Sequence, residues 1–269
     1  MIVDKKIKKL YSILKSIDSA LVAFSGGVDS TFLLAVCADT FKDKLLAVTG
    51  ISSSFPKSEI AQAVSLAKRL KVRHKLVIET PPQKFWENSA RRCYYCKKQL
   101  FVQLKRLAAK NGLQCVIDAT NADDKGDYRP GTRALQELGV RSPLKEAGLT
   151  KPEIRALSRA MGLSTWKKPA MACLASRIPY GERITPEKLL MVGRAEEFIR
   201  KLGFQQVRVR LHGQVARIEV ASEKIPSAVK VGKEISAKLK SLGFAYVSID
   251  LDGYCSGSLN RTLKWKRKR

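Results

Sequence analysis

The sequence predicts an α/β protein, in which a parallel sheet covered by helices is followed by a smaller α+β domain. Short apolar segments alternate with amphipathic helical segments up to residue 161, which is the pattern of successive βαβ units. A Ser-Gly-Gly turn follows the first apolar segment, at the kind of strand end where such folds bind ligands. The last third of the chain contains a repeat of helix-like and strand-like segments.

The elements of the first domain follow from the spacing of apolar residues. Apolar residues that recur three and four positions apart predict helices over 4–17, 30–40, 56–70, 97–110 and 150–161. Thr150 is the expected N-cap of the last helix, with Pro152 in its first turn. Short apolar runs predict strands over 20–24, 44–49, 75–78 and 115–118. The loops after these strands should meet at one edge of a parallel sheet.

The C-terminal third repeats itself at a constant offset. Residues 202–213 and 242–253 share Leu, Gly, Phe, Val, Leu and Gly at matching positions. Helices are predicted before each copy, at 186–201 and 226–240, and a strand at 215–220 between them. This order predicts a small α+β layer with pseudo-twofold symmetry. An irregular stretch over 166–173 places the expected domains at 1–165 and 166–260, followed by a basic tail over 261–269.

Composition limits the class of protein. The chain has 269 residues, 45% of them hydrophobic, which suits two globular domains. No apolar run approaches the roughly 20 residues that cross a membrane, and the N-terminus does not resemble a signal peptide, so we expect a cytoplasmic protein with no membrane partner. The net charge of +27 attracts polyanions, but the basic residues are dispersed. Nucleic acid is therefore not the expected partner, and a homo-oligomer is expected.

The turn between the first strand and the second helix has the composition of a phosphate site. Two glycines allow close approach of the backbone, and the following helix offers unpaired N–H groups and the positive end of its dipole. It lacks the Gly-Lys-Ser/Thr ending of a Walker loop. The candidate nucleotide-binding residues are Ser25, Gly26, Gly27, Asp29, Ser30 and Thr31. The segment resembles the SGGxDS loop of ATP pyrophosphatases, which implies cleavage of ATP to AMP and pyrophosphate.

A second candidate site is the loop over 119–131, at the end of the fourth predicted strand. It is rich in carboxylates, which suit Mg²⁺ on a leaving pyrophosphate, and it contains an arginine able to pair with phosphate. Its candidate residues are Asn121, Asp123, Asp124, Asp127 and Arg129. Asp29 of the phosphate loop joins the three aspartates as a candidate Mg²⁺ ligand and is a candidate catalytic residue. A polar surface loop of the same composition is the alternative, because Asn, Asp and Gly also favour turns.

Three of the six cysteines are candidates for chemistry. Cys93 and Cys96 form a C-x-x-C at the start of a predicted helix, where basic neighbours suit thiolate ligands, although a redox pair or an accidental motif stays open. Cys173 follows the irregular stretch and is a candidate nucleophile or a buried structural cysteine. Lys168 and Arg177 are the basic residues expected to favour its thiolate.

Arginines line one face of the strand in the first repeat copy. Alternation places the side chains of Arg208, Arg210 and His212 on one face. The opposite face then carries Val207, Val209 and Leu211. The basic face is a candidate phosphate-binding surface.

Four motifs together resemble the LarE-type ATP-dependent sulfur transferases of the lactate racemase maturation family. They are the phosphate loop, Arg92-Cys-Tyr-Tyr-Cys-Lys97, the Asp-Asp-x-x-Asp-Tyr-Arg-Pro-Gly loop, and Ala172-Cys-Leu-Ala-Ser-Arg-Ile-Pro-Tyr-Gly181. The resemblance implies that ATP adenylates a carboxylate of pyridinium-3,5-biscarboxylic acid mononucleotide, and that sulfur arrives from Cys173. It also implies that Arg208 and Arg210 hold the substrate phosphate.

The cysteines leave two routes for the sulfur. Cys173 alone can give up its own sulfur and become dehydroalanine in a single turnover. Cys93, Cys96 and Cys173 can instead hold a [4Fe–4S] cluster with one open iron, fed by sulfide or a sulfur donor, and this is the favoured expectation. A tRNA-thiolating enzyme and a non-catalytic ATP sensor with a metal clip are the alternative functions.

Overall fold

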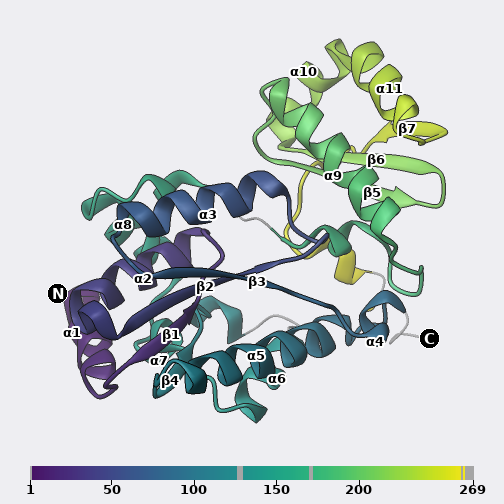
Figure 1. Ribbon diagram of the computed structural model, residues 1–269. Coiled ribbons are helices and arrows are strands. Elements are labelled where there is room, and N and C mark those ends of the chain that lie inside the picture. The colour runs from purple at the N-terminus through teal and green to yellow at the C-terminus, as the bar shows by residue number, and fades with distance from the viewer. Residues whose placement is uncertain (1, 126–129, 170–171, 262, 264–269) are drawn as a thin grey trace. The chain divides into compact units, whose positions relative to one another are not determined.

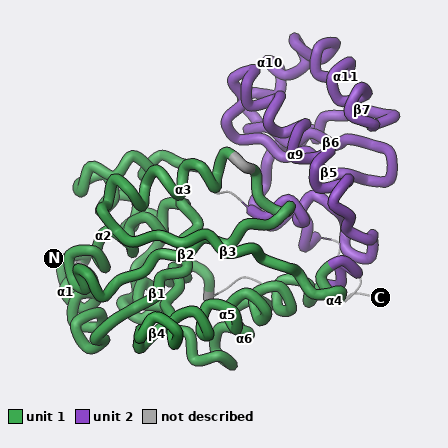
Figure 2. The backbone as a smooth tube through the Cα atoms, viewed as in Figure 1, with its two compact units in different colours: residues 1–85, 90–171 green, residues 86–89, 172–269 purple. Residues whose placement is uncertain are grey.

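The computed structural model describes residues 2–125, 130–169, 172–261 and 263, and the chain divides into two compact units (Figures 1 and 2). Residues 1–85 and 90–171 form the first unit, and residues 86–89 and 172–269 form the second. The chain therefore crosses from one unit to the other at three points, and the short helix α4 (Gln83–Trp86) includes the first of them.

The first unit alternates strands with helices. Its strands are β1 (Ala20–Ala23), β2 (Leu45–Ile51), β3 (His74–Ile78) and β4 (Cys115–Ile117). Its α-helices are α1 (Ile2–Lys15), α2 (Val28–Phe41), α3 (Lys57–Arg69), α5 (Arg92–Lys110), α6 (Pro130–Glu137), α7 (Pro143–Glu146) and α8 (Lys151–Ala160). Its 3₁₀ helices are η1 (Lys42–Lys44), η2 (Ala122–Lys125) and η3 (Ser164–Lys167).

The four strands form a parallel sheet in the order β3-β2-β1-β4. The chain moves outward from β1 to β3 and then returns to place β4 on the other side of β1. The direction of winding therefore changes between β1 and β4, and in open α/β sheets this switch point is where ligands bind.

Helices cover both faces of this sheet (Figure 1). Ala20 and Val22 of β1 pack in one apolar cluster with residues of α1, α2, α3 and α8, whereas Leu21 packs in a second cluster with residues of α5 and α6. Adjacent residues of β1 thus face opposite layers, as strand geometry requires. The predicted α/β class is confirmed.

Helix α5 begins before its predicted start at residue 97. Its first residue is Arg92, so Cys93 and Cys96 lie in the first turns of the helix and on the same side of it. The C-x-x-C motif therefore lies at the start of a helix, as predicted.

The second unit contains a three-stranded sheet. Its strands are β5 (Val207–His212), β6 (Val215–Val220) and β7 (Tyr246–Ile249). Its helices are α9 (Pro186–Lys201), α10 (Ile225–Lys230) and α11 (Gly232–Ser241), with 3₁₀ helices η4 (Leu174–Arg177), η5 (Ser222–Lys224) and η6 (Ser258–Asn260). Strand β6 lies in the centre, antiparallel to β5 and parallel to β7.

The two copies of the sequence repeat end their helices in the same way. Gly203 and Gly243 adopt φ values of 96° and 109°, which favour glycine. Each following phenylalanine N–H bonds back to a helix carbonyl, Phe204 to Ile199 and Phe244 to Leu239. The prediction of one helix over 226–240 was wrong, because the chain breaks at Val231 into α10 and α11.

Across the parts of the chain that the structure describes, no helix combines the length and apolar character required for crossing a membrane.

Candidate functional site

The Ser-Gly-Gly turn lies at the switch point of the first unit, directly after β1. Ser30 Oγ lies 3.0 Å from Ser25 Oγ and donates to the Gly27 carbonyl at 3.3 Å. Gly27 is the N-cap of α2, and no side chain caps that helix. The first N–H groups of α2 are therefore available to an anion, and the dipole of the helix favours one there.

Gly26 is required at its position for two reasons. Its φ of +68° is unfavourable for other residues. A Cβ atom there would lie 3.1 Å from Ala63 Cβ and 3.2 Å from Ala63 Cα on α3, so backbone as well as side chain would be in the way. The turn is consequently packed directly against α3.

Asp29 and Asp123, two of the predicted Mg²⁺ ligands, both contact Lys151 at the start of α8. The Lys151 ammonium lies 2.5 Å from Asp29 Oδ2, and the Lys151 backbone N–H donates to Asp123 Oδ2 at 2.7 Å. The start of α8 is fixed by a capping box between Thr150 and Glu153. A residue that the sequence analysis did not single out thus engages both carboxylates.

Two buried oxygens in the first turn of α2 lack hydrogen-bond partners among the described residues. They are Asp29 Oδ1 and Thr31 Oγ1, and Thr31 as a whole is fully buried. An unpaired buried oxygen is unusual and calls for an explanation. Because Mg²⁺ prefers carboxylate oxygens and retains several waters, the Asp29 carboxylate fits a magnesium ligand.

Residues of the 119–131 loop also close a local turn. Asn121 is buried, its N–H donates to Asp124 Oδ2 at 3.0 Å, and its own side-chain oxygen accepts the Asp123 N–H at 3.0 Å. Turn chemistry therefore accounts for part of this polar composition. Asp127, a predicted Mg²⁺ ligand, and Arg129, predicted to pair with phosphate, lie outside the described residues.

The two cysteines of α5 have different surroundings. Cys93 is exposed, while Cys96 is partly buried and its thiol donates to Glu79 Oε1 at 2.8 Å. Glu79 directly follows β3, and burial raises the pKa of its carboxyl group. Glu79 is therefore an additional polar residue beside the C-x-x-C motif.

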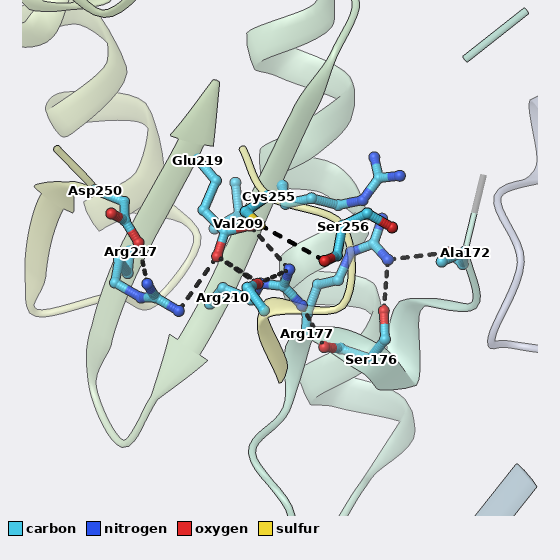
Figure 3. A network of polar contacts seen from close by, with 12 residues as sticks. Ala172, Ser176, Arg177, Val209, Arg210, Arg217, Glu219, Asp250, Cys255 and Ser256 are labelled. Atoms are coloured by element: carbon cyan, nitrogen blue, oxygen red, sulfur yellow. Dashed lines mark hydrogen bonds and ion pairs between the residues drawn. The ribbon is translucent and has the colours of Figure 1, made fainter. Parts of the chain in front are cut away.

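Cys173 belongs to the second unit, where Arg177 bonds to its backbone carbonyl. Figure 3 shows Arg177 beside Ala172 and Ser176. Arg177 Nη1 donates to the carbonyls of Ala172 at 3.0 Å and Cys173 at 3.3 Å, and to Ser176 Oγ at 2.7 Å. Its Nε and Nη2 atoms donate to Glu196 at 2.6 and 2.9 Å, and both charged side chains are fully buried. The loop that carries Cys173 is thus attached to α9 through a buried ion pair.

Glu196 is surrounded by positive charge. It also accepts from Arg200 Nη2 at 2.6 Å and from the Val209 N–H at 3.0 Å. Burial acts to raise the pKa of the Glu196 carboxyl, but the charges of Arg177, Arg208 and Arg200 hold it below its ordinary value.

The arginine face of β5 is covered rather than exposed. Arg208 is 3% exposed, and its guanidinium carbon lies 5.2 Å from the centre of the Tyr254 ring. Burial, followed by the charge of Arg177, lowers the pKa of Arg208 to about 10. Arg210 is 6% exposed and forms a two-pronged ion pair with Glu219, at 2.9 and 2.8 Å. His212, on the same face of the strand, is exposed.

Arg210 also ties β5 to other parts of the second unit (Figure 3). It donates to the Ser176 carbonyl at 2.7 Å and to Ser258 Oγ at 2.8 Å. On the opposite face Val207, Val209 and Leu211 are buried, as the alternation predicted.

The sequence analysis missed the carboxylates that pair with these arginines. Glu196 lies on the buried face of α9 with Leu189, Val192 and Ile199, and Glu219 lies between buried residues of β6. A lone carboxylate on an apolar face is the signal that would have identified both, because such groups are buried only when they are paired.

Lys168 lies at the phosphate loop, although the sequence analysis assigned it to Cys173. Its ammonium contacts the Gly26 carbonyl at 3.1 Å, Glu59 Oε2 at 2.6 Å and Gln62 Oε1 at 2.5 Å. Three acceptors match the three donors of a lysine. All four residues belong to the first unit, so Lys168 joins the segment after η3 to the phosphate loop and α3.

Within the described ranges, no three His, Cys, Asp or Glu side chains group closely enough to form a metal site. Of the predicted cluster ligands, Cys93 and Cys96 lie in the first unit and Cys173 in the second.

The parallel sheet, its strand order and the Ser-Gly-Gly turn at its switch point define a protein of the PP-loop α/β class. No family model matches the chain. The chain is 38% identical, over 94% of its length and 93% of the relative, to the pyridinium-3,5-bisthiocarboxylic acid mononucleotide synthase of Lactiplantibacillus plantarum. It therefore belongs to the family of this synthase.

Two uncharacterised proteins are also similar to the chain. One, from Synechocystis, is 43% identical over 97% of this chain and 98% of its own length. The other, from Methanocaldococcus jannaschii, is 28% identical over 95% of this chain and all of its own length.

Proposed function

We propose that the protein is an ATP-dependent sulfur transferase that converts a carboxylate of a pyridinium mononucleotide to a thiocarboxylate. The name of the L. plantarum relative supports this substrate class. In this chain, the observation that carries the proposal is the uncapped start of α2 behind the Ser-Gly-Gly turn, with Asp29 beside it. That arrangement suits a polyphosphate with a bound cation.

The reaction has two displacement steps. A carboxylate oxygen of the substrate attacks the α-phosphorus of ATP, the bond to the β-phosphate oxygen breaks, and pyrophosphate leaves. A sulfur nucleophile then attacks the acyl carbon of the adenylate, and the bond between that carbon and the bridging oxygen breaks. AMP leaves with the oxygen that came from the carboxylate.

The first unit would stabilise the leaving pyrophosphate. The N–H groups at the start of α2 would bind its oxygens, and the Ser25 and Ser30 hydroxyls would order the turn around them. Asp29 and Asp123 would hold Mg²⁺, which neutralises negative charge on the pyrophosphate when it is bound.

The arginines of the second unit would hold the phosphate of the substrate. Arg177, Arg200 and Arg208 surround the single carboxylate of Glu196, which leaves an excess of buried positive charge. A phosphate dianion compensates such an excess, and guanidinium groups bind it through paired hydrogen bonds. Burial, followed by the charge of Arg177, lowers the pKa of Arg208, so a phosphate anion beside this guanidinium would stabilise its charged form. Arg210 would support the same site through its bonds to Glu219 and Ser176.

Cys173 would be the sulfur-bearing residue, on a loop fixed by Arg177. In a single-turnover reaction its thiolate forms a thioester with the substrate. Loss of the Cα proton of residue 173 and cleavage of its Cβ–S bond then leave dehydroalanine in the chain and release the sulfur on the substrate as a thiocarboxylate. Cys93 and Cys96 are three residues apart in α5, and the Cys93 thiol is exposed. Two such thiols suit ligands of a [4Fe–4S] cluster, for which Cys173 would be the third ligand. Such a cluster, when bound, would supply sulfide repeatedly.

Reaction with pyridinium-3,5-biscarboxylic acid mononucleotide, ATP, Mg²⁺ and a sulfide source tests the function. We expect pyrophosphate and AMP to form together with a product in which sulfur has replaced oxygen, as measured by mass spectrometry. Cys173→Ser should abolish the sulfur-containing product while retaining pyrophosphate release. Absence of pyrophosphate release by the wild-type protein with this substrate would contradict the proposal.

Anaerobic iron and acid-labile sulfide analysis distinguishes the two sulfur routes. About four of each per chain, lost in Cys93→Ala, is expected for the cluster. Wild-type protein without iron, carrying dehydroalanine at position 173 after one turnover, would instead establish the single-turnover route.

A further inference from the structure

Lys151 occupies an unusual position beside the phosphate loop. Its ammonium contacts the Asp29 carboxylate at 2.5 Å, and its backbone N–H contacts the Asp123 carboxylate at 2.7 Å. The residue begins α8, whereas Asp29 belongs to α2 and Asp123 to η2, so contacts over long sequence separations assemble the group. All three residues belong to the first unit.

The contact with Asp29 is incomplete on the carboxylate side. Oδ2 of Asp29 accepts from Lys151, while Oδ1 is buried and lacks a hydrogen-bond partner among the described residues. The Lys151 side chain is 31% exposed and that of Asp29 is 20% exposed, so the ammonium can reach solvent. An ion pair of this kind can exchange partners when a stronger set of charges arrives.

Charge balance indicates what such an exchange would achieve. A cation that binds Asp29 has to compete with the ammonium of Lys151, which already neutralises that carboxylate. An ammonium released from Asp29 would still be close to the start of α2, where the uncapped N–H groups suit phosphate oxygens.

We propose that Lys151 is an exchangeable counter-ion of the nucleotide site, which pairs with Asp29 in the free protein and with the phosphates of ATP in the bound state. This inference rests on the proposed function, because it requires a nucleotide with a divalent cation at the phosphate loop. It adds a binding residue, and it adds a reason for the cation and the nucleotide to bind together.

The proposal predicts effects of opposite sign on two ligands. Replacing Lys151 by methionine removes the competing charge from Asp29, so Mn²⁺ alone should bind about fivefold more tightly. The same substitution removes a charged hydrogen bond to phosphate, so ATP with Mg²⁺ should bind roughly 10–100-fold more weakly. A residue that only stabilised the fold would weaken both ligands or neither.

Binding measurements on the full-length protein test this without relying on turnover. Mn²⁺ binding without nucleotide is followed by electron paramagnetic resonance, and ATP binding with Mg²⁺ by calorimetry, for wild type, Lys151→Met and Lys151→Arg. Lys6→Met is the matched control, because Lys6 pairs with Glu153 of α8, the helix that begins with Lys151, and the substitution removes one positive charge just as Lys151→Met does. Circular dichroism establishes that each variant is folded.

Three results together would support the exchange. Lys151→Met would bind Mn²⁺ more tightly and ATP more weakly, Lys151→Arg would partly recover both affinities, and Lys6→Met would change neither. Unchanged Mn²⁺ affinity in Lys151→Met, or ATP affinity equal to that of the wild type, would overturn it. A wild-type protein that does not bind ATP at all would instead contradict the proposed function, so the two failures are distinguishable.

Discussion

The phosphate loop of the first unit and the arginine network of the second are built on opposite principles. Backbone groups and short side chains form the loop, and Asp29 Oδ1 and Thr31 Oγ1 stay buried without partners among the described residues. In the network, the guanidinium of Arg177 is bonded to Glu196 and to nearby carbonyls in every direction. The loop is thus arranged for a ligand that supplies missing bonds, whereas Arg177 is already held by hydrogen bonds within the second unit.

The largest expected effect comes from breaking the network. Glu196→Leu leaves Arg177 buried without its carboxylate, so the free energy of unfolding should fall by about 3–5 kcal/mol in urea denaturation. Glu197→Gln is the control, because the neighbouring Glu197 side chain is 62% exposed and forms a surface ion pair with Lys201. Its effect should stay within about 0.5 kcal/mol. Equal stability of the two variants would contradict the structural role of the ion pair.

A change to the loop backbone comes next. Gly26→Ala forces a positive φ on alanine and places its Cβ against the Ala63 backbone, so stability should fall by about 1–3 kcal/mol and ATP binding should weaken. Gly112→Ala is the matched control, since Gly112 has a φ of +66° but nothing within 4 Å of an added Cβ. If both variants bind ATP like the wild type, the close packing of the turn on α3 does not matter for the nucleotide.

Lys168 offers a smaller perturbation of the same loop. Lys168→Met removes the bonds to the Gly26 carbonyl, Glu59 and Gln62, so ATP binding should weaken by about 1–2 kcal/mol in calorimetry. Lys167→Met serves as the comparison, because Lys167 stacks on Trp166 instead. Equal ATP affinity in both variants would show that the segment after η3 does not order the loop.

The smallest expected effect is the contribution of the two histidines, His74 and His212, to the pH dependence of stability. Thr49 Oγ1 donates to the Phe24 carbonyl, so its 2.8 Å contact with His74 Nε2 makes His74 the donor there. Burial lowers the pKa of His74. The imidazole of His212 is only partly shielded from water, and this shielding together with the charges of Arg217 and Arg210 lowers its pKa.

The unfolded chain therefore takes up protons more readily than the folded protein. The stability that these histidines contribute is present above their ordinary pKa of 6.5 and is lost as the pH falls below it. Urea denaturation across this range should show a shallower loss of stability in His74→Gln and in His212→Gln than in the wild type. An unchanged slope in both variants would contradict the lowered pKa values.

The difference between the units also explains what the sequence could predict. The Ser-Gly-Gly turn and the βαβ order are local features, so glycine content and apolar spacing were enough to predict a turn after β1 and the strands around it. The partners of Arg177 and Arg210 come from α9 and β6, and the partner of Asp29 from α8, at sequence separations that no local pattern specifies. Lys168 was assigned to Cys173 because they are close in sequence, whereas its contacts lie with the phosphate loop.

The central claim is that ATP activates a carboxylate of the substrate, and isotope transfer tests it most directly. The pyridinium substrate is prepared with oxygen-18 in its carboxylates and allowed to react with ATP, Mg²⁺ and sulfide, and the AMP is then examined by mass spectrometry. The account predicts one labelled oxygen in AMP for each sulfur that enters the product. Unlabelled AMP, with sulfur nevertheless incorporated, would contradict it.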